Sequence, residues 1–152
     1  MHSIYLSFQG LEKDRIESFR VRHDSLVTKV EAHITVLFPI QGYDLQRLIK
    51  SVDRLGFSGG LKIELEEEIT YSENVGYLKV ISGSEKIVDI YRHFLTDLGL
   101  SEEYHYEPHV TVVRDESCSE SSLYLKDTTF VISGLIIEII GENGESIIQY
   151  QI

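Results

Sequence analysis

The sequence holds two copies of one short pattern, His33-Ile34-Thr35-Val36-Leu37-Phe38-Pro39 and Pro108-His109-Val110-Thr111-Val112-Val113-Arg114. Over the four residues from its histidine, each copy alternates polar and apolar residues, which is typical of a half-buried β-strand. Successive side chains of a strand point to opposite faces. Each copy therefore presents an imidazole and a threonine hydroxyl on one face, and directs its aliphatic residues towards the core.

The segments around the two copies predict a similar series of elements. The first copy follows a predicted strand over 3–8 and a predicted helix over 11–22, with Leu11, Ile16 and Phe19 roughly on one face. The second follows a strand over 76–82 and a helix over 84–98. A shift of 76 residues, half the chain, brings the first strand, the helix and the His-x-Thr motif onto their later counterparts. This internal repeat predicts a bilobal α+β domain over 1–152, with approximate two-fold symmetry and both motifs facing one cleft.

The remaining segments are assigned by apolar spacing and by turn residues. The clearest helix runs over 44–55, with Asp44 and Gly56 suited to its two caps. We also expect strands over 62–71, 135–140 and 146–152, a hairpin turn over 141–145 and a polar loop over 117–122.

Two imidazoles and two hydroxyls around one small volume suit phosphoester chemistry. An imidazole with the ordinary pKa of ~6.5 gains or loses a proton near neutral pH. One histidine can take a proton from the nucleophile while the other protonates the leaving oxygen. Threonine hydroxyls can donate hydrogen bonds to the non-bridging phosphate oxygens, where negative charge resides in the transition state. This scheme requires neither a metal nor a cofactor.

A structural interpretation of the motifs is less convincing. One His-x-Thr in a strand is more often a half-buried structural histidine. Six histidines and seven threonines in 152 residues give about 0.3 such tripeptides by chance. Two copies, both in apolar strands and at the shift that aligns their surroundings, favour catalysis by His33 and His109.

Charge and composition limit the partners. The net charge is −11, with 14 basic and 25 acidic residues. A broad basic surface for duplex nucleic acid is therefore not expected, whereas a small nucleotide or an RNA end could enter a local positive pocket. We expect neither a membrane-spanning stretch nor a secretory signal. The single Cys118 cannot form an internal disulfide. We expect a cytoplasmic monomer that does not bind membranes.

Two other features near the second motif have competing interpretations. His105 and His109 have the i, i+4 spacing of a helical metal site, but Pro108 between them disfavours a helix. Tyr104 and Tyr106 could stack on a base or pack in the core and rim, and the sequence leaves both open.

The two copies, together with Phe19-Arg20-Val21-Arg22-His23-Asp24, resemble the two-histidine (2H) phosphoesterase superfamily, and within it the 2′-5′ RNA ligase and cyclic-phosphodiesterase-like branch. The resemblance covers essentially the whole chain. It implies a fold of two antiparallel-sheet lobes with helices on the outside. It also implies cleavage of a 2′,3′-cyclic phosphate or a 2′-5′ phosphodiester, as in RNA processing.

The resemblance also implies roles for individual residues. His33 matches the proton donor to the leaving oxygen, and His109 matches the base that activates water. Thr35 and Thr111 match phosphate-binding hydroxyls, and Arg114 matches a basic residue that binds substrate in several members. Two alternatives stay open at this stage: a module that binds a nucleotide or RNA end without turnover, and a 2′-5′ RNA ligase.

Overall fold

The computed structural model describes residues 1–102, 104–114 and 122–152. In chain order, its elements are β1 (His2–Gln9), α1 (Lys13–His23), β2 (Ile34–Ile40), α2 (Leu45–Leu55), β3 (Leu61–Leu65), β4 (Thr70–Ser72), β5 (Val75–Ser82), α3 (Ser84–Leu98), β6 (His109–Val113), β7 (Thr129–Ile140) and β8 (Ser146–Gln151). Apart from Ser122, the expected loop over 117–122 lies outside the described residues, and so does Cys118.

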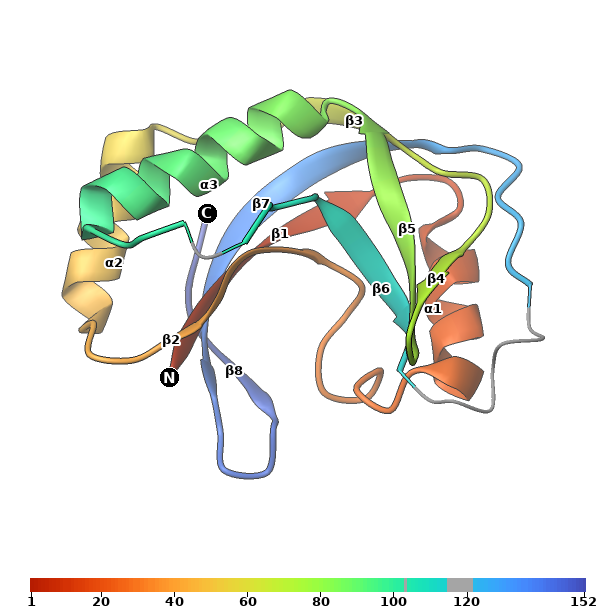
Figure 1. The fold of residues 1–152 in the computed structure, drawn as a ribbon, viewed down its shortest axis with the longest axis horizontal. Helices are drawn as coiled ribbons and strands as arrows, with labels where there is room; N and C mark the ends of the chain where they lie inside the picture. The colour runs from red at the N-terminus through yellow and green to blue at the C-terminus, as the bar shows by residue number, and fades with distance from the viewer. Residues whose placement is uncertain (103, 115–121) are drawn as a thin grey trace.

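The strands form one sheet, in the order β1-β2-β6-β5-β3-β7-β8, and β4 pairs with β5. Neighbours are antiparallel throughout the described residues. Because β1 also pairs with β7, six strands close into a ring. In Figure 1 the sheet bends into an arch, with β1, β2, β7 and β8 on one side and β4, β5 and β6 on the other. The predicted α+β class with two antiparallel lobes is confirmed.

The helices lie on the outside of the arch, as expected, with α2 and α3 over one side and α1 over the other (Figure 1). α1 packs on β6, whereas α3 packs on β2 and on α2. The helix of each half therefore supports the strand that carries the motif of the other half. In the described residues, no helix has the length and apolar character needed to cross a membrane.

The caps of α2 and α3 agree with the sequence. The Asp44 side chain accepts a hydrogen bond from Arg47 N at 2.8 Å, and Gly56 ends α2 in the left-handed conformation. Before α3, Gly83 has a φ of 80°, and a Cβ there would lie 2.7 Å from the Lys62 carbonyl oxygen. A glycine is therefore required at this turn.

The apolar face expected for α1 holds for Ile16 and Phe19 but not for Leu11. Leu11 precedes the helix and is 87% exposed. The helix buries Ile16 but also two charged side chains, Lys13 and Arg20. Apolar spacing could not predict this face, because the groups that neutralise these charges come from other parts of the chain.

Two strand predictions also need correction. The strand expected over 62–71 divides into β3 and β4, where the Glu66 carboxylate accepts hydrogen bonds from Thr70 Oγ1 and Lys79 N. The strand expected over 135–140 begins at Thr129 instead. Gly134 interrupts its pattern because a Cβ there would lie 2.7 Å from the backbone oxygen of Ile152.

The repeat is present, but one shift does not describe it. The motifs match at 76 residues, since Ile34 pairs with Val110. The first strands match at 72 residues, since Tyr5 lies opposite Thr35 and Tyr77 lies opposite Thr111. The second half is longer between these points because α3 has 15 residues and α1 has 11.

Candidate active site

The two motifs meet where β2 and β6 pair, at Ile34 and Val110. Both of these residues are fully buried. The four polar side chains of the motifs lie on the opposite face and are half-buried, as expected: His33, Thr35, His109 and Thr111. The pair Ile34–Val110 therefore marks the approximate two-fold axis of the site.

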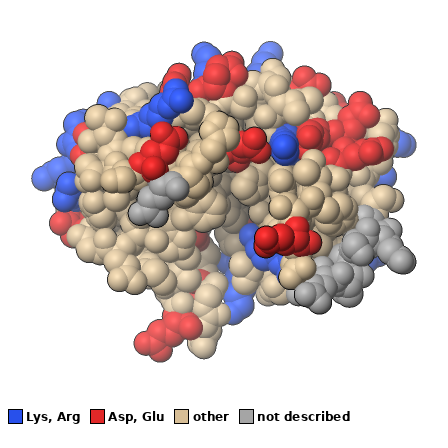
Figure 2. Space-filling view, in the orientation of Figure 1, with Lys and Arg blue, Asp and Glu red and all other residues tan. Residues whose placement is uncertain are grey.

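Because β2 and β6 are antiparallel, the histidine of each motif lies opposite the threonine of the other. Residues on either side of a cross-strand pair face each other on the neighbouring strand. His33 therefore lies across from Thr111, and Thr35 lies across from His109. The structure thus brings the four predicted residues together on the face that borders the hollow between the lobes. Figure 2 shows this hollow, with Lys and Arg side chains at part of its rim.

Each imidazole is held by the same local contact. His33 Nδ1 lies 2.7 Å from the Glu31 carbonyl oxygen, and His109 Nδ1 lies 2.8 Å from the Glu107 carbonyl oxygen. A carbonyl oxygen only accepts, so each Nδ1 carries the proton and donates it. In the neutral ring this leaves the lone pair on Nε2, available to a substrate or a water molecule.

Each imidazole also lies against a tyrosine that we did not predict. The ring centroids of Tyr5 and His33 are 4.5 Å apart, and those of Tyr77 and His109 are 4.9 Å apart. Both tyrosines come from the strand that precedes the helix of their half. Aligning the first strands at a shift of 72 residues would have revealed them.

The electrostatic surroundings of His33 are unusual. Burial lowers the pKa of His33 to about 4, and the positive charges of Arg20 and Arg114 act in the same direction. The contact with Glu31 and the charge of Asp24 oppose the shift without cancelling it. At pH 7 the ring of the free protein is therefore neutral.

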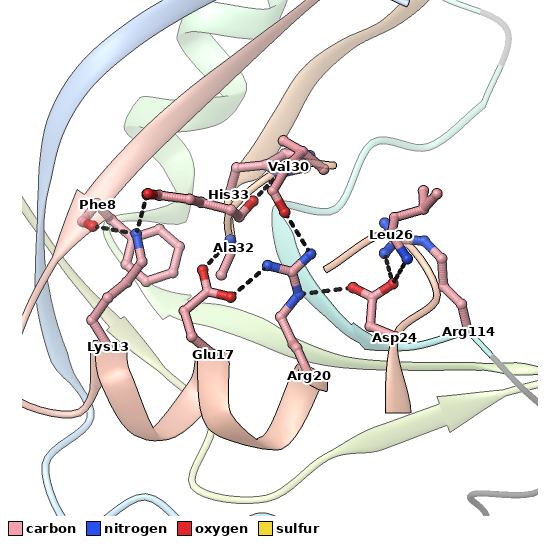
Figure 3. A network of polar contacts seen from close by, with 11 residues as sticks. Phe8, Lys13, Glu17, Arg20, Asp24, Leu26, Val30, Ala32, His33 and Arg114 are labelled. Atoms are coloured by element: carbon pink, nitrogen blue, oxygen red, sulfur yellow. Dashed lines mark hydrogen bonds and ion pairs between the residues drawn. The ribbon is translucent and has the colours of Figure 1, made fainter. Parts of the chain in front are cut away.

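Arg114 is part of a buried ion-pair network. Its Nη1 donates to Oδ1 of Asp24, which also accepts from Leu26 N at 3.0 Å, while Oδ2 accepts from Arg20 Nε at 2.7 Å (Figure 3). Burial of Asp24 opposes its ionisation, but the hydrogen bonds from Arg114 and Leu26 lower the pKa of this carboxyl overall. Substrate binding by Arg114 stays a prediction, since this contact already holds part of its guanidinium.

Two cavities lie near the motifs, one lined by His109 and the other by Tyr5 and the residues that precede His33. The cavity beside His109, of about 410 Å³, is lined by aromatic residues and by carboxylates, among them Phe38, Tyr77, Tyr104 and Glu73. The rings of Phe38 and Tyr104 are 5.8 Å apart and both are exposed. The cavity beside Tyr5, of about 440 Å³, is lined largely by polar groups, including Ser7, Lys29, Ser133 and Gln151.

Tyr104 and Tyr106 have different environments in the structure: Tyr106 is buried and Tyr104 is exposed. Tyr106 is buried, stacks on Tyr91 at 4.3 Å, and donates its hydroxyl to the Thr35 carbonyl oxygen at 2.8 Å. It therefore packs in the core, whereas Tyr104 lies on the cavity wall. The segment from His105 to Pro108 is not helical. Within residues 1–102, 104–114 and 122–152, no three His, Cys, Asp or Glu side chains come together to hold a metal ion.

Comparisons with known proteins agree with this geometry. A family model described as the 2′-5′ RNA ligase superfamily matches residues 9–125, which include both motifs. E. coli LigT complexed with 3′-AMP is 9% identical, with 99% of this chain and 95% of that chain covered and a TM-score of 0.71. TT0787 of Thermus thermophilus is 13% identical, with 99% and 96% covered and a TM-score of 0.71. No curated protein sequence matches the chain.

Proposed function

The chain belongs to the 2′-5′ RNA ligase superfamily, and from this premise we propose that it is a metal-independent phosphodiesterase. Membership makes it a phosphoester-cleaving or phosphoester-ligating enzyme. The proposed substrate is a 2′,3′-cyclic phosphate or a 2′-5′ phosphodiester in a small nucleotide or at an RNA end. The observation that carries the proposal is the crossed arrangement of two His-x-Thr motifs around the pair Ile34–Val110.

Two Nε2 atoms on one face can move both protons that hydrolysis requires. In the roles implied by the family resemblance, His109 Nε2 takes a proton from water as the water oxygen bonds to phosphorus. The bond from phosphorus to the leaving oxygen breaks, and His33 gives that oxygen a proton. Thr35 and Thr111 donate hydrogen bonds to the non-bridging oxygens as negative charge builds up there. After product release, proton exchange with solvent restores both histidines.

The low pKa of His33 adds a condition to this scheme. A neutral His33 cannot donate the proton at pH 7, so the ring must be protonated when the substrate is bound. A phosphodiester carries a negative charge, and an opposite charge within about 4–6 Å favours the protonated imidazole. Substrate binding would therefore raise the pKa of His33 and prepare it as the acid.

The cavity beside His109 supports a nucleotide as the substrate. Stacking of a base on exposed aromatic rings is worth about 1–3 kcal/mol per base, and Phe38 and Tyr104 are both exposed in this cavity. The carboxylate of Glu73 can accept hydrogen bonds from the amino group of a base. Solved structures of the relative LigT hold 3′-AMP, ATP and NADP+.

The test is a product assay on the full chain with EDTA and no added metal, using 2′,3′-cyclic nucleotides and 2′-5′ oligoadenylates. We expect turnover, and a loss of about 10²–10⁴ in kcat for both His33→Ala and His109→Ala. His93→Ala is the matched control, because His93 Nε2 contacts the Ser51 carbonyl oxygen, away from the motifs. Full activity in either motif variant would refute the proposal, and binding without product would favour the non-catalytic module.

A further inference from the structure

Helix α1 buries a charged face where most helices bury an apolar one. Lys13, Glu17 and Arg20 follow the i, i+4, i+7 spacing of a single helix face. Lys13 is 7% exposed and Arg20 is 1% exposed. Charged side chains are almost never fully buried unless they are paired. The partners of this face therefore indicate what it does.

Each of the three side chains contacts one of the residues that directly precede His33; Figure 3 shows Val30 and Ala32 among these partners. Arg20 Nη2 donates to the Val30 carbonyl oxygen at 3.0 Å. Ala32 N donates to Oε1 of Glu17. Lys13 Nζ donates to the Phe8 carbonyl oxygen at 3.0 Å and lies 3.7 Å from the Glu31 carboxylate. The helix thus holds the backbone on both sides of Glu31, whose carbonyl accepts the hydrogen bond from His33 Nδ1.

Arg20 joins the Val30 carbonyl, the Glu17 carboxylate and the Asp24 carboxylate. Its Nη1 donates to Oε2 of Glu17 at 2.8 Å, and its Nε donates to Oδ2 of Asp24 at 2.7 Å. A guanidinium offers donors in a fixed fork, so three acceptors in different directions set its position closely. The side chains joined through Arg20 and Asp24 carry two positive charges, on Arg20 and Arg114, and two negative ones, on Glu17 and Asp24.

The segment before His109 is supported differently. Val80 N donates to the Pro108 carbonyl oxygen at 3.0 Å, and Tyr106 packs in the core. The charged contact there, Lys79 to Glu107 at 3.5 Å, joins exposed side chains. Pairs of this kind contribute little, because solvent screens them. Of the two segments that precede the motif histidines, only the one before His33 is thus held by a buried charged support within the described residues.

We propose that Arg20 is a positioning residue for His33, acting through the Val30 carbonyl and Glu17 to fix the Glu31 carbonyl that orients the imidazole. Its catalytic effect rests on the proposed function, since it requires His33 to act on substrate. The effect of Arg20 on the tautomer of the His33 ring is independent of the proposed function. A loosened Glu31 carbonyl would release Nδ1–H, and His33 would then populate the other neutral tautomer.

The test uses Arg20→Lys in the full chain, because an ammonium group is a point donor that cannot reach three separated acceptors. Histidine ¹⁵N NMR at pH 7 reports the tautomer of each ring, and His109 is an internal control in the same spectrum. We expect the His33 ring nitrogens to shift towards the Nε2–H form, with His109 unchanged. We also expect a kcat about ten- to a hundredfold lower, with KM nearly constant. Arg22→Lys, exposed on the same helix, should match the wild type.

Unchanged His33 signals in folded Arg20→Lys would overturn the proposal, and so would equal shifts at His33 and His109, which indicate a general loosening. If Arg20→Lys does not fold, Glu17→Ala provides the same test, since it removes the bond to Ala32 N from a partly exposed side chain. The NMR readout does not depend on turnover. An inactive wild-type protein would contradict the phosphodiesterase and leave the positioning of His33 to be decided by the spectra.

Discussion

The half-site around His33 and the half-site around His109 have the same local geometry but different supports. In each, Nδ1 contacts the carbonyl oxygen two residues earlier, and a tyrosine lies against the ring. Behind His33 lies a buried network of charges, and behind His109 lie aromatic packing and backbone hydrogen bonds. The repeated strand pattern produces the shared chemistry. The helices and loops outside the strands give the two imidazoles different surroundings.

The largest expected effect comes from removing the Asp24 carboxylate, which links Arg20 to Arg114 in the buried network near His33. Asp24→Ala leaves Arg20 buried without one of its carboxylate partners, and breaking such a pair costs about 3–5 kcal/mol. Urea-induced unfolding measures the loss. Asp97→Ala, which breaks the exposed pair with Arg54, is the control and should cost much less, because solvent screens exposed pairs. Equal losses in both variants would show that the network contributes no more than a surface pair.

A second prediction uses the pH dependence of stability. The pKa of His33 is about 4 in the folded protein and ~6.5 in an unfolded chain. The unfolded state therefore binds more protons between these values, so stability is fully present above pH 6.5 and falls as the pH drops towards 4. The loss is at most about 3 kcal/mol for this shift.

His33→Gln should flatten the stability profile between pH 6.5 and 4, because glutamine does not titrate. Chemical unfolding at a series of pH values measures the difference between the variant and the wild type. A profile as steep in His33→Gln as in the wild type would assign the pH dependence to other groups. Asp24, whose pKa is lowered from 3.8, acts below this range.

A third prediction concerns the two threonine hydroxyls, which occupy equivalent positions in the two half-sites. Thr35→Val and Thr111→Val keep the shape of the side chain and remove the hydroxyl. If both hydroxyls stabilise the phosphate in the transition state, each variant lowers kcat by about ten- to a hundredfold. Steady-state kinetics on a cyclic nucleotide measure both. A large effect in one variant and none in the other would mean that the phosphate is held by one half-site.

The smallest expected effect comes from the aromatic support. Tyr106→Phe removes the hydrogen bond to the Thr35 carbonyl oxygen and keeps the stacking on Tyr91. One such bond contributes about 1 kcal/mol, and the carbonyl left behind adds to the cost only if water cannot reach it. Thermal unfolding measures the change. If Tyr106→Phe lost as much stability as Asp24→Ala, the buried charges near His33 would contribute no more than the hydrogen bond of Tyr106, contrary to the prediction.

Much of the fold follows from local patterns. The residues of α3 and β6, and the caps of α2, match the expectation, because a helix stripe and its capping residues act within a few turns of chain. The four motif residues share a half-buried face for the same reason, since alternation in a strand is local. The family resemblance, which the match over residues 9–125 confirms, also rests on these motifs.

The errors arise where distant segments decide the outcome. Leu11 was expected on one helix face with Ile16 and Phe19, but it lies exposed before α1. The groups that make a charged inner face of α1 favourable lie around Val30 and Arg114. Tyr5 and Tyr77 were not identified because a helix four residues longer in one half changes the shift between the repeats. Substrate contact by Arg114, which the family resemblance implies, stays a prediction; its ion pair with Asp24, a contact across 90 residues, could not be predicted from the sequence.

The sequence by itself therefore determined the two His-x-Thr strands, their shared face and the repeated order of strand and helix, because side-chain periodicity depends only on neighbouring residues. The tertiary structure alone decided that α1 and α3 each pack on the motif strand of the other half. It also decided that buried charges lie near His33, whereas a cavity with exposed aromatic rings lies beside His109. The physical reason is that burial and Coulomb interactions depend on distance in space. Residues far apart in the chain thus give two identical tripeptide patterns different electrostatic surroundings.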